Sequence, residues 1–429
     1  MRTVGGLHAR MWARENLLGA VHLAATGRRD RPEVQAYLAR LEEELAALQE
    51  QLASARPQCG ECLTFTIFDP KERLITAPVF RERVLHHAVM SVCGPVLDRR
   101  LIHHTYACRQ GKGTVAALHA AQQAAGAAGW FLKLDVRKYF ASIPHDRLFA
   151  ALARVFREEK VLRLLATLVT AYRPGETQGL AIGTLISQHL ANFYLAPLDT
   201  LVLQELRPAG YVRYMDDMAL WTAEAAGARA ARDRLTEFAD AELGLAFKTA
   251  FSNRTPHGMD FLGHRVFPQR LGLNRTSRRR YRAKLCRLHA DWVSGRVDEA
   301  TAQIRATALT AFTRHARCKT WRRRVVMNLG DGPQAGTACS VAGAGSTTAG
   351  TPDPPSATAT PRTTGTTTSV SGPAPAPAER RSALMEQAGL PASPHRAADK
   401  TNHTRRWPVA AGRACAPDEG ERRVPASTL

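Results

Sequence analysis

The sequence predicts an α+β fold with an antiparallel sheet, and three observations carry this prediction. Tyr211 to Tyr214 and Met218 to Trp221 are short aromatic and apolar runs on either side of an acidic pair, so they predict a β-hairpin with a tight turn. The apolar run from Phe131 to Asp135 predicts another strand, which ends in a carboxylate. Helical patterns surround both features, which is typical of a mixed fold.

Length and composition allow a sizeable core. The chain has 429 residues, enough for two or three domains, and 45% of them are hydrophobic. Its formal net charge of +21 is unevenly placed: residues 270–328 hold 16 Lys and Arg against 3 Asp and Glu, whereas residues 329–429 hold 10 against 8. A basic segment of that density predicts a polyanionic partner whose affinity falls as salt rises.

The sequence offers no sign of a membrane span or of export. No apolar run reaches the length of a transmembrane helix, and the N-terminus lacks an apolar core followed by a small-residue cleavage site. Eight cysteines without regular spacing fit a reducing compartment, so we expect a cytoplasmic location. Cys59 and Cys62 form a lone pair of thiols, and because structural zinc usually takes four ligands, buried or idle cysteines are favoured over a zinc site.

In chain order, the first elements are helices and a hairpin. Residues 12–23 and 33–52 predict helices, and the second carries leucines at three- and four-residue spacing: Leu38, Leu41, Leu45, Leu48 and Leu52. A run this short favours a packed helix over a coiled-coil arm. Alternation at 64–69 and 74–76, with a turn between them, predicts a hairpin.

Further helices and loops follow. Helical patterns are found at 78–88, 147–156, 161–171, 187–198, 227–243, 281–293 and 298–314. Glycines flank Lys112 in a loop at 105–114, but the spacing of a phosphate-binding P-loop is missing. Residues 259–266 predict a second hairpin, in which Gly263 permits the bend. From 329 to 429 Gly, Thr, Ala, Ser and Pro dominate, so we expect a disordered tail.

The acidic pair Asp216 and Asp217 indicates a cation site. Two adjacent carboxylates at a hairpin tip repel each other unless cations lie there, and hard oxygen ligands suit Mg²⁺. Taken alone, an Asp-Asp dipeptide is more often an ordinary surface turn. The strand that ends in Asp135 supplies a second carboxylate position, and the two positions together match the ligands of a two-metal site for nucleotidyl transfer.

At these residues the chain resembles the reverse transcriptases. Tyr214-Met215-Asp216-Asp217 after an apolar strand looks like the signature of that family, and Asp135 matches its first metal-ligand motif. The resemblance covers about residues 12–328. It implies a right-hand polymerase: an N-terminal helical segment at 1–59, fingers and an antiparallel palm at 60–268, a basic helical thumb at 269–328 and a tail at 329–429.

The resemblance also implies roles for single residues. Asp135, Asp216 and Asp217 would be catalytic and hold two Mg²⁺ ions, for which Mn²⁺ is a substitute, with the Val136 carbonyl assisting. Nucleotide contacts would come from Lys71, Arg73, Phe140, Ile182, Gly183, Gln188 and Lys248. The primer grip would comprise Phe261, Leu262 and Gly263. Within these sets, Phe140 matches the steric gate against ribose, although an ordinary core aromatic is the alternative, and Lys248 has an exposed strand lysine as its alternative.

One motif departs from the common family pattern. Ile182-Gly183-x-x-x-Ser187-Gln188 stands where Gln-Gly followed by three residues and Ser-Pro is usual, and this form resembles the reverse transcriptases of diversity-generating retroelements. Asp69-Pro-Lys, Phe80-Arg-Glu-Arg-Val and Tyr106-Ala-Cys-Arg-x-Gly-Lys-Gly resemble that group as well. Membership would imply a bacterial or phage-encoded enzyme with deoxynucleotides and a template RNA as substrates, errors at template adenines, and a small basic accessory protein.

Two alternatives are distinguishable from the sequence. A reverse transcriptase of a group II intron or a defence system would share the metal site, but an intron enzyme should carry a maturase or endonuclease extension, and the tail has neither zinc-ligand nor His-Asn-His spacing. A non-catalytic RNA-binding scaffold with a palm fold is the other alternative. The complete set of three aspartates argues against it.

Overall fold

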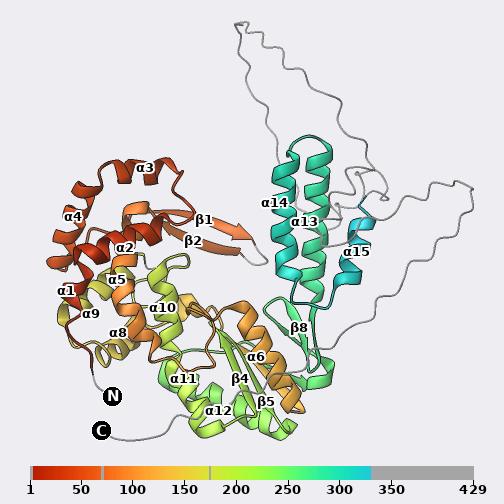
Figure 1. Cartoon of the computed structure of the whole chain (residues 1–429). Coiled ribbons are helices and arrows are strands. Elements are labelled where there is room, and N and C mark those ends of the chain that lie inside the picture. Colours follow the sequence, from red (N-terminus) through yellow and green to blue (C-terminus); the bar gives the residue numbers. More distant parts are fainter. Residues whose placement is uncertain (1–2, 69–71, 173–174, 330–429) are drawn as a thin grey trace, which may run out of the picture. The chain divides into compact units, whose positions relative to one another are not determined.

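The computed structural model describes residues 3–68, 72–172 and 175–329 (Figure 1). Within these residues, helices accompany antiparallel sheets of two, four and three strands, so the predicted α+β class is confirmed. The predicted tail lies outside the described residues, except for Leu329. None of the described helices combines the length and the apolar character that a membrane span requires.

The four-stranded sheet has the order β4-β5-β3-β6. Its strands are β3 (Trp130–Asp135), β4 (Gly210–Tyr214), β5 (Asp217–Thr222) and β6 (Phe251–Arg254). The predicted hairpin is confirmed, because β4 and β5 pair antiparallel across a two-residue turn of Met215 and Asp216. β3 also pairs antiparallel with β5, and this long-range pairing joins the two predicted strand patterns.

Alternation along these strands divides the interior into two cores. Successive strand residues point to opposite faces of a sheet. Leu132, Leu134, Met218 and Leu220 belong to the larger core, which α12 (Ala225–Leu243) covers through Ala228 and Leu235. Phe131, Val212, Ala219 and Trp221 belong to a second core, which α6 (Thr114–Ala127) covers with alanines. Strands β3, β4 and β5 are therefore mostly buried between α6 and α12 (Figure 1).

The N-terminal part consists of α1 (His8–Met11), α2 (Arg14–Ala25), α3 (Pro32–Ala39) and α4 (Leu41–Ala53). The prediction of one helix over 33–52 was wrong at its middle, because Arg40 leaves helical geometry with φ −118° and ψ 34°. Leu45, Leu48 and Leu52 are buried in the larger core, so the packed interpretation is confirmed over the coiled-coil arm.

The predicted hairpin at 64–76 is confirmed as β1 (Cys62–Phe68) and β2 (Glu72–Pro78). It is followed by α5 (Phe80–Asp98), α7 (Tyr139–Ser142), α8 (His145–Ala153) and α9 (Glu159–Ala171). The long helix predicted over 187–198 is two helices, α10 (Leu185–Tyr194) and α11 (Ala196–Leu201), which meet at Leu195, and a π-helical turn at Val202–Leu206 extends α11.

The three-stranded sheet has the order β7-β8-β9, from β7 (Met259–Phe261), β8 (His264–Phe267) and β9 (Arg270–Leu273). It confirms the second predicted hairpin. It also adds β9, which was not recognised from the sequence because the strand is short and contains a glycine. The basic helices are α13 (Arg275–Val293), α14 (Glu299–Thr313) and α15 (Lys319–Met327). The six cysteines among the described residues are free, Cys59 and Cys62 included.

The contact between α6 and β4 depends on a glycine. A Cβ added at Gly210 would lie 2.4 Å from the Cβ of Ala124, well inside van der Waals contact, whereas a Cβ at Gly126 of the same helix would meet nothing within 4 Å. We expect Gly210→Ala to lower the free energy of unfolding by about 1–3 kcal/mol through overpacking. Gly126→Ala should leave it unchanged or raise it by up to about 1 kcal/mol, because alanine favours helix. Urea denaturation of the two variants checks this pair, and equal effects would contradict the packing argument.

Candidate active site

The pairing register of β3 and β5 brings the predicted carboxylates together. Asp135, the last residue of β3, is the Cα partner of Asp217, the first residue of β5. Directly opposed residues of an antiparallel pair lie about 4.5–5.5 Å apart at Cα and share a face of the sheet. Asp216 precedes Asp217 in the turn. Three carboxylates thus gather at one end of the central sheet, as the sequence required.

Two lysines pair with these carboxylates. The Nζ atom of Lys248 donates to Oδ1 of Asp135, and the Lys248 backbone N–H donates to the Asp135 carbonyl over 2.8 Å. Nζ of Lys133 lies 3.3 Å from Oδ1 of Asp217 and donates to the Asp260 carbonyl over 2.8 Å. The contact with Asp217 is within ion-pair range but lacks hydrogen-bond geometry, so Oδ1 of Asp217 is buried without a hydrogen-bond partner.

The surroundings of Asp216 and Asp217 disfavour the ionised form of both carboxyl groups. Burial raises the pKa of Asp217 to about 6; the carboxylates of Asp135 and Asp216 contribute to the rise, and Lys133 opposes it. Burial, followed by the charge of Asp135, also raises the pKa of Asp216 above its usual range. Because burial and mutual repulsion destabilise these ionised carboxylates, a nearby cation would stabilise them. The site is therefore electrostatically suited to a divalent ion.

The donor set fits Mg²⁺ in its chemistry. Mg²⁺ prefers carboxylate oxygens and binds through a few of them together with substrate phosphates. Among the residues that the structure describes, no three His, Cys, Asp or Glu side chains are already arranged around a common ion position. Asp135 and Asp217 face lysines instead. Oδ1 of Asp217 is buried and accepts no hydrogen bond, and its ion-pair contact is with Lys133, so it has lone pairs that fit a cation ligand. The assignment of Asp135, Val136, Asp216 and Asp217 as metal ligands stays a prediction.

Of the two basic residues predicted on the β1–β2 hairpin, one can be placed. Arg73 lies in β2 as the partner of Ile67. Its charge lowers the pKa of Asp216, which opposes the rise caused by burial, so the guanidinium acts on the acidic turn. Lys71 lies outside the described residues.

Phe140 lies in α7, five positions after Asp135. Its side chain is half-buried against the larger core, and its carbonyl accepts a hydrogen bond from the Leu180 N–H over 2.7 Å. Both the steric gate and the core aromatic are compatible with this position. The gate role therefore stays a prediction.

The motif at 182–188 packs on the β1–β2 hairpin. The Ile182 carbonyl accepts from the Thr76 N–H over 2.8 Å. Gly183 has φ 116°, and a Cβ there would lie 2.4 Å from the Thr76 carbonyl oxygen. From the sequence, we expected Gly183 to let the backbone approach the substrate closely. In the structure the backbone at Gly183 approaches β2 instead, and this contact by itself requires glycine. Oε1 of Gln188 accepts from the Cys108 thiol over 3.6 Å. Nucleotide contacts of these residues stay predictions.

The predicted primer-grip residues form the turn between β7 and β8. Phe261 ends β7 and is buried, while Leu262 and Gly263 have φ values of 47° and 79°. The bend that the sequence assigned to Gly263 is confirmed, since a Cβ there would lie 2.9 Å from Oγ of Ser277 in α13. The primer-grip role of these residues stays a prediction.

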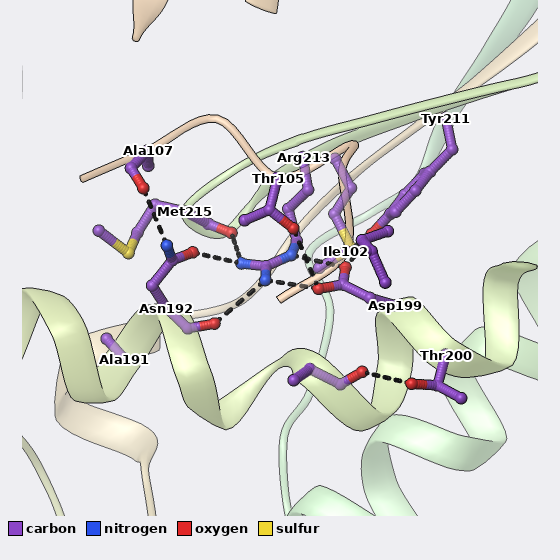
Figure 2. A network of polar contacts seen from close by, with 12 residues as sticks. Ile102, Thr105, Ala107, Ala191, Asn192, Asp199, Thr200, Tyr211, Arg213 and Met215 are labelled. Carbon is purple, nitrogen blue, oxygen red and sulfur yellow. Dashed lines mark hydrogen bonds and ion pairs between the residues drawn. The ribbon is translucent and has the colours of Figure 1, made fainter. Parts of the chain in front are cut away.

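Sequence reasoning missed a buried polar network beside the acidic turn (Figure 2). Arg213 of β4 and Asp199 of α11 both have side chains that are 0% exposed, and they form an ion pair of 2.6 Å. Arg213 also donates to the Met215 carbonyl over 2.9 Å. The available signal was an arginine and an aspartate within otherwise apolar segments, because such residues are almost never fully buried unless they are paired.

The central part of the chain matches a known protein family. Residues 69–266, from the β1–β2 hairpin to β8, match the family model described as reverse transcriptase (RNA-dependent DNA polymerase). Over these residues the chain is similar to the reverse transcriptases. This match agrees with the right-hand polymerase class that the sequence predicted, and the three aspartates lie within the matched residues.

Similar proteins share only part of their length with this chain. A COX1/OXI3 intron 1 protein of Saccharomyces cerevisiae is 23% identical over 126 residues, and an uncharacterized 91 kDa protein in cob intron of Schizosaccharomyces pombe is 24% identical over 143 residues. These matches cover 28% and 32% of this chain, but only 15% and 16% of the relatives.

Solved telomerase structures are also similar to this chain. The telomerase of Candida tropicalis in complex with a TWJ fragment of telomeric RNA aligns at 10% identity and a TM-score of 0.41, over 63% of this chain and 55% of that one. The corresponding complex from Candida albicans aligns at 10% identity and a TM-score of 0.39, over 69% and 64%.

The raised pKa of Asp217 predicts a stabilising substitution. A carboxyl whose pKa is higher in the fold than in the unfolded chain destabilises the fold once both forms are ionised, above about pH 6, and the effect vanishes below about pH 4. Without divalent ions, Asp217→Asn should raise the free energy of unfolding at pH 8 by on the order of 1–3 kcal/mol. Chemical denaturation in a chelator at pH 8 and pH 4.5 measures the gain, which should shrink at the lower pH.

The exposed Asp240 of α12 provides the control, because Asp240→Asn removes the same charge outside the site. A variant Asp217→Asn that is less stable than the wild type at pH 8 would show that the ion pair with Lys133 outweighs burial.

Proposed function

We propose that the chain is an RNA-directed DNA polymerase that transfers deoxynucleotidyl groups to a primer 3′-hydroxyl, with pyrophosphate leaving. The observation that carries the proposal is the opposition of Asp135 and Asp217, with Asp216 beside them, inside the residues that match the reverse transcriptase family. Two Mg²⁺ ions bound there would lower the pKa of the attacking hydroxyl and neutralise the leaving pyrophosphate. Mn²⁺ would substitute.

The chain's own cations suit the triphosphate. Arg73 acts electrostatically on Asp216 from β2, and Lys248 lies against Asp135. A nucleotide that binds between them would bring its phosphates to both cations, and we assign them, with Lys71, to that role. Lys248 would exchange its carboxylate partner for phosphate oxygens, which form charge-assisted hydrogen bonds of similar strength.

Basic residues after the matched residues suit the nucleic acid. We propose residues 60–268 as fingers and palm and 269–328 as a thumb, whose α13 carries arginines and one lysine at exposed positions. Cations of this kind hold the phosphate backbone without reading bases. Template RNA and the growing duplex are the proposed occupants.

Primer extension on a homopolymer RNA template tests this function. With Mg²⁺ present, Asp216→Ala should lower kcat/KM by about 1,000-fold or more, because a proposed ligand of the metal ions that stabilise the transition-state charge is lost. Asp240→Ala, an exposed acid of α12, should extend the primer as the wild type does. If the wild-type chain extends no primer, or if Asp216→Ala extends it normally, the polymerase assignment is wrong.

We further propose that the enzyme belongs to a diversity-generating retroelement of a bacterium or phage, acts in the cytoplasm and works with a small basic accessory protein. The support is the form of the 182–188 motif. Ile182 replaces an amide side chain next to the proposed nucleotide site, which removes a polar contact and with it discrimination on the order of 1–3 kcal/mol. Relaxed base selection at template adenines is the expected result.

Restoring the amide tests this finer proposal. Ile182→Gln should lower misincorporation opposite template adenine by about tenfold, the equivalent of one such contact. Sequencing of cDNA made by the purified enzyme measures it, and errors at the other three bases serve as the internal control. Unchanged errors at adenine would contradict the proposed role of Ile182.

An intron-associated reverse transcriptase is the second candidate, because both curated relatives are named as intron proteins. An adenine-mutated repeat pair beside the gene would favour the retroelement. Flanking intron sequence would favour the second candidate.

A further inference from the structure

We propose that Arg213, held by Asp199 and Asn192, is a positioning residue that fixes the backbone of the acidic turn and so sets where the Asp216 carboxylate lies. This inference rests on the proposed polymerase function and deepens it. Nothing in the family match or in the similar proteins assigns a role to these three residues.

The turn adopts a backbone conformation that its residue does not favour. Met215, the first of the two turn residues, has φ 57°, in the left-handed region that favours glycine. Glycine is the usual residue at this place in a two-residue hairpin loop, because a Cβ is disfavoured there. A methionine in this conformation persists when surrounding contacts over-determine it, and such residues cluster at functional sites.

Arg213 supplies the restraining contact. Its Nη1 donates to the Met215 carbonyl over 2.9 Å, which is the carbonyl of the peptide bond to Asp216. The same Nη1 donates to Oδ1 of Asn192 over 3.0 Å. Rotation of that peptide would break the contact to Arg213 and change the direction in which Asp216 presents its carboxylate.

The guanidinium is itself fixed on its other side. Nε and Nη2 donate to the two carboxylate oxygens of Asp199 over 2.7 and 2.6 Å, a two-point pairing that sets its plane. Nη2 also donates to the Asn192 carbonyl over 3.1 Å. Burial alone lowers the pKa of Arg213, but the charge and hydrogen bonds of Asp199 outweigh burial and raise it, so the arginine stays charged.

The partners are anchored in turn (Figure 2). Nδ2 of Asn192 donates to the Ala107 carbonyl over 2.8 Å, and the hydroxyls of Tyr211 and Thr105 donate to Asp199 over 2.7 and 3.3 Å. The network therefore joins α10, α11, β4 and the loop at 105–114 around one guanidinium. The loop bonds to Asp199 and Asn192, and these two residues hold the guanidinium that bonds to the acidic turn.

Stability alone does not account for a buried ion pair of this kind. Well-packed apolar residues of similar volume are often as stabilising as a buried charged pair, so such a pair is weak evidence for a purely structural role. An apolar side chain could fill the space of Arg213, but it could not donate to Met215. Only the planar, five-donor guanidinium reaches Asp199, Asn192 and Met215 together.

The variant Arg213→Lys tests the proposal, since it keeps the charge but cannot make all of these contacts. We expect kcat of primer extension to fall by about 100-fold, the effect of a misplacement of roughly 1 Å, with an unchanged KM for the primer and template. Mn²⁺ titrated into the full chain by calorimetry should bind several-fold more weakly. Asp216→Asn provides the reference for lost metal binding, and thermal unfolding establishes that the variant is folded.

Met215→Gly separates positioning from general destabilisation. Glycine adopts positive φ without strain, so the turn then needs the restraint less. In that background, Arg213→Lys should lower kcat by about tenfold or less, a coupling that a merely structural role would not produce. If Arg213→Lys does not fold, Asn192→Ala replaces it in the same pair of backgrounds, since it removes no charge and loses the side-chain contacts to Arg213 and Ala107.

Wild-type kcat and Mn²⁺ affinity in a folded Arg213→Lys variant would overturn the proposal, as would an equal loss in both backgrounds. Failure of the polymerase function is recognised separately. In that case the wild type extends no primer on any template, while the Mn²⁺ titration still compares the arginine and lysine forms.

Discussion

The structure depends on the antiparallel pairing of β3 with β5. This pairing connects segments that lie far apart in the sequence, and its register sets Asp135 opposite Asp217. A slip by one residue would turn every side chain of β3 to the other face of the sheet. Leu132 and Leu134 would then leave the larger core, and Asp135 would leave the carboxylate site. The packing of the two cores and the geometry of the site are therefore specified by the same register.

The fold brings the three carboxylates together although burial and mutual repulsion disfavour their ionised forms. Asp216 and Asp217 are partly shielded from water and lie close to Asp135, so their ionised forms are disfavoured and their pKa values rise. Three cations reduce this repulsion: Lys133 in β3, Arg73 in β2, and Lys248 in the loop after α12. Such a balance leaves a site that gains from a bound cation, and a buried, unbonded oxygen on Asp217 is consistent with it.

Small residues make the surrounding fold possible. Gly210 lets β4 approach the alanines of α6, and Gly183 lets the segment before α10 approach the Thr76 carbonyl of β2. In both places backbone lies where a side chain would otherwise be. The first contact packs α6 on the sheet that carries the aspartates, and the second packs the segment before α10 on the hairpin that carries Arg73. Arg213 adds a buried polar contact to the acidic turn.

The sequence by itself determined the features that are local. Alternation and an acidic turn predicted the β4–β5 hairpin, and leucine spacing predicted the packed face of α4. The Tyr-Met-Asp-Asp motif identified Asp216 and Asp217, and the apolar strand that ends in a carboxylate identified Asp135. Tertiary structure decided what depends on distant neighbours: the β3–β5 register, the interruptions at Arg40 and Leu195, the pairing of β9, the contact that requires Gly183, and the burial of Arg213 with Asp199. Periodicity records which side of an element is buried, but not which residue of another segment lies opposite, because that choice is made by packing across the whole core.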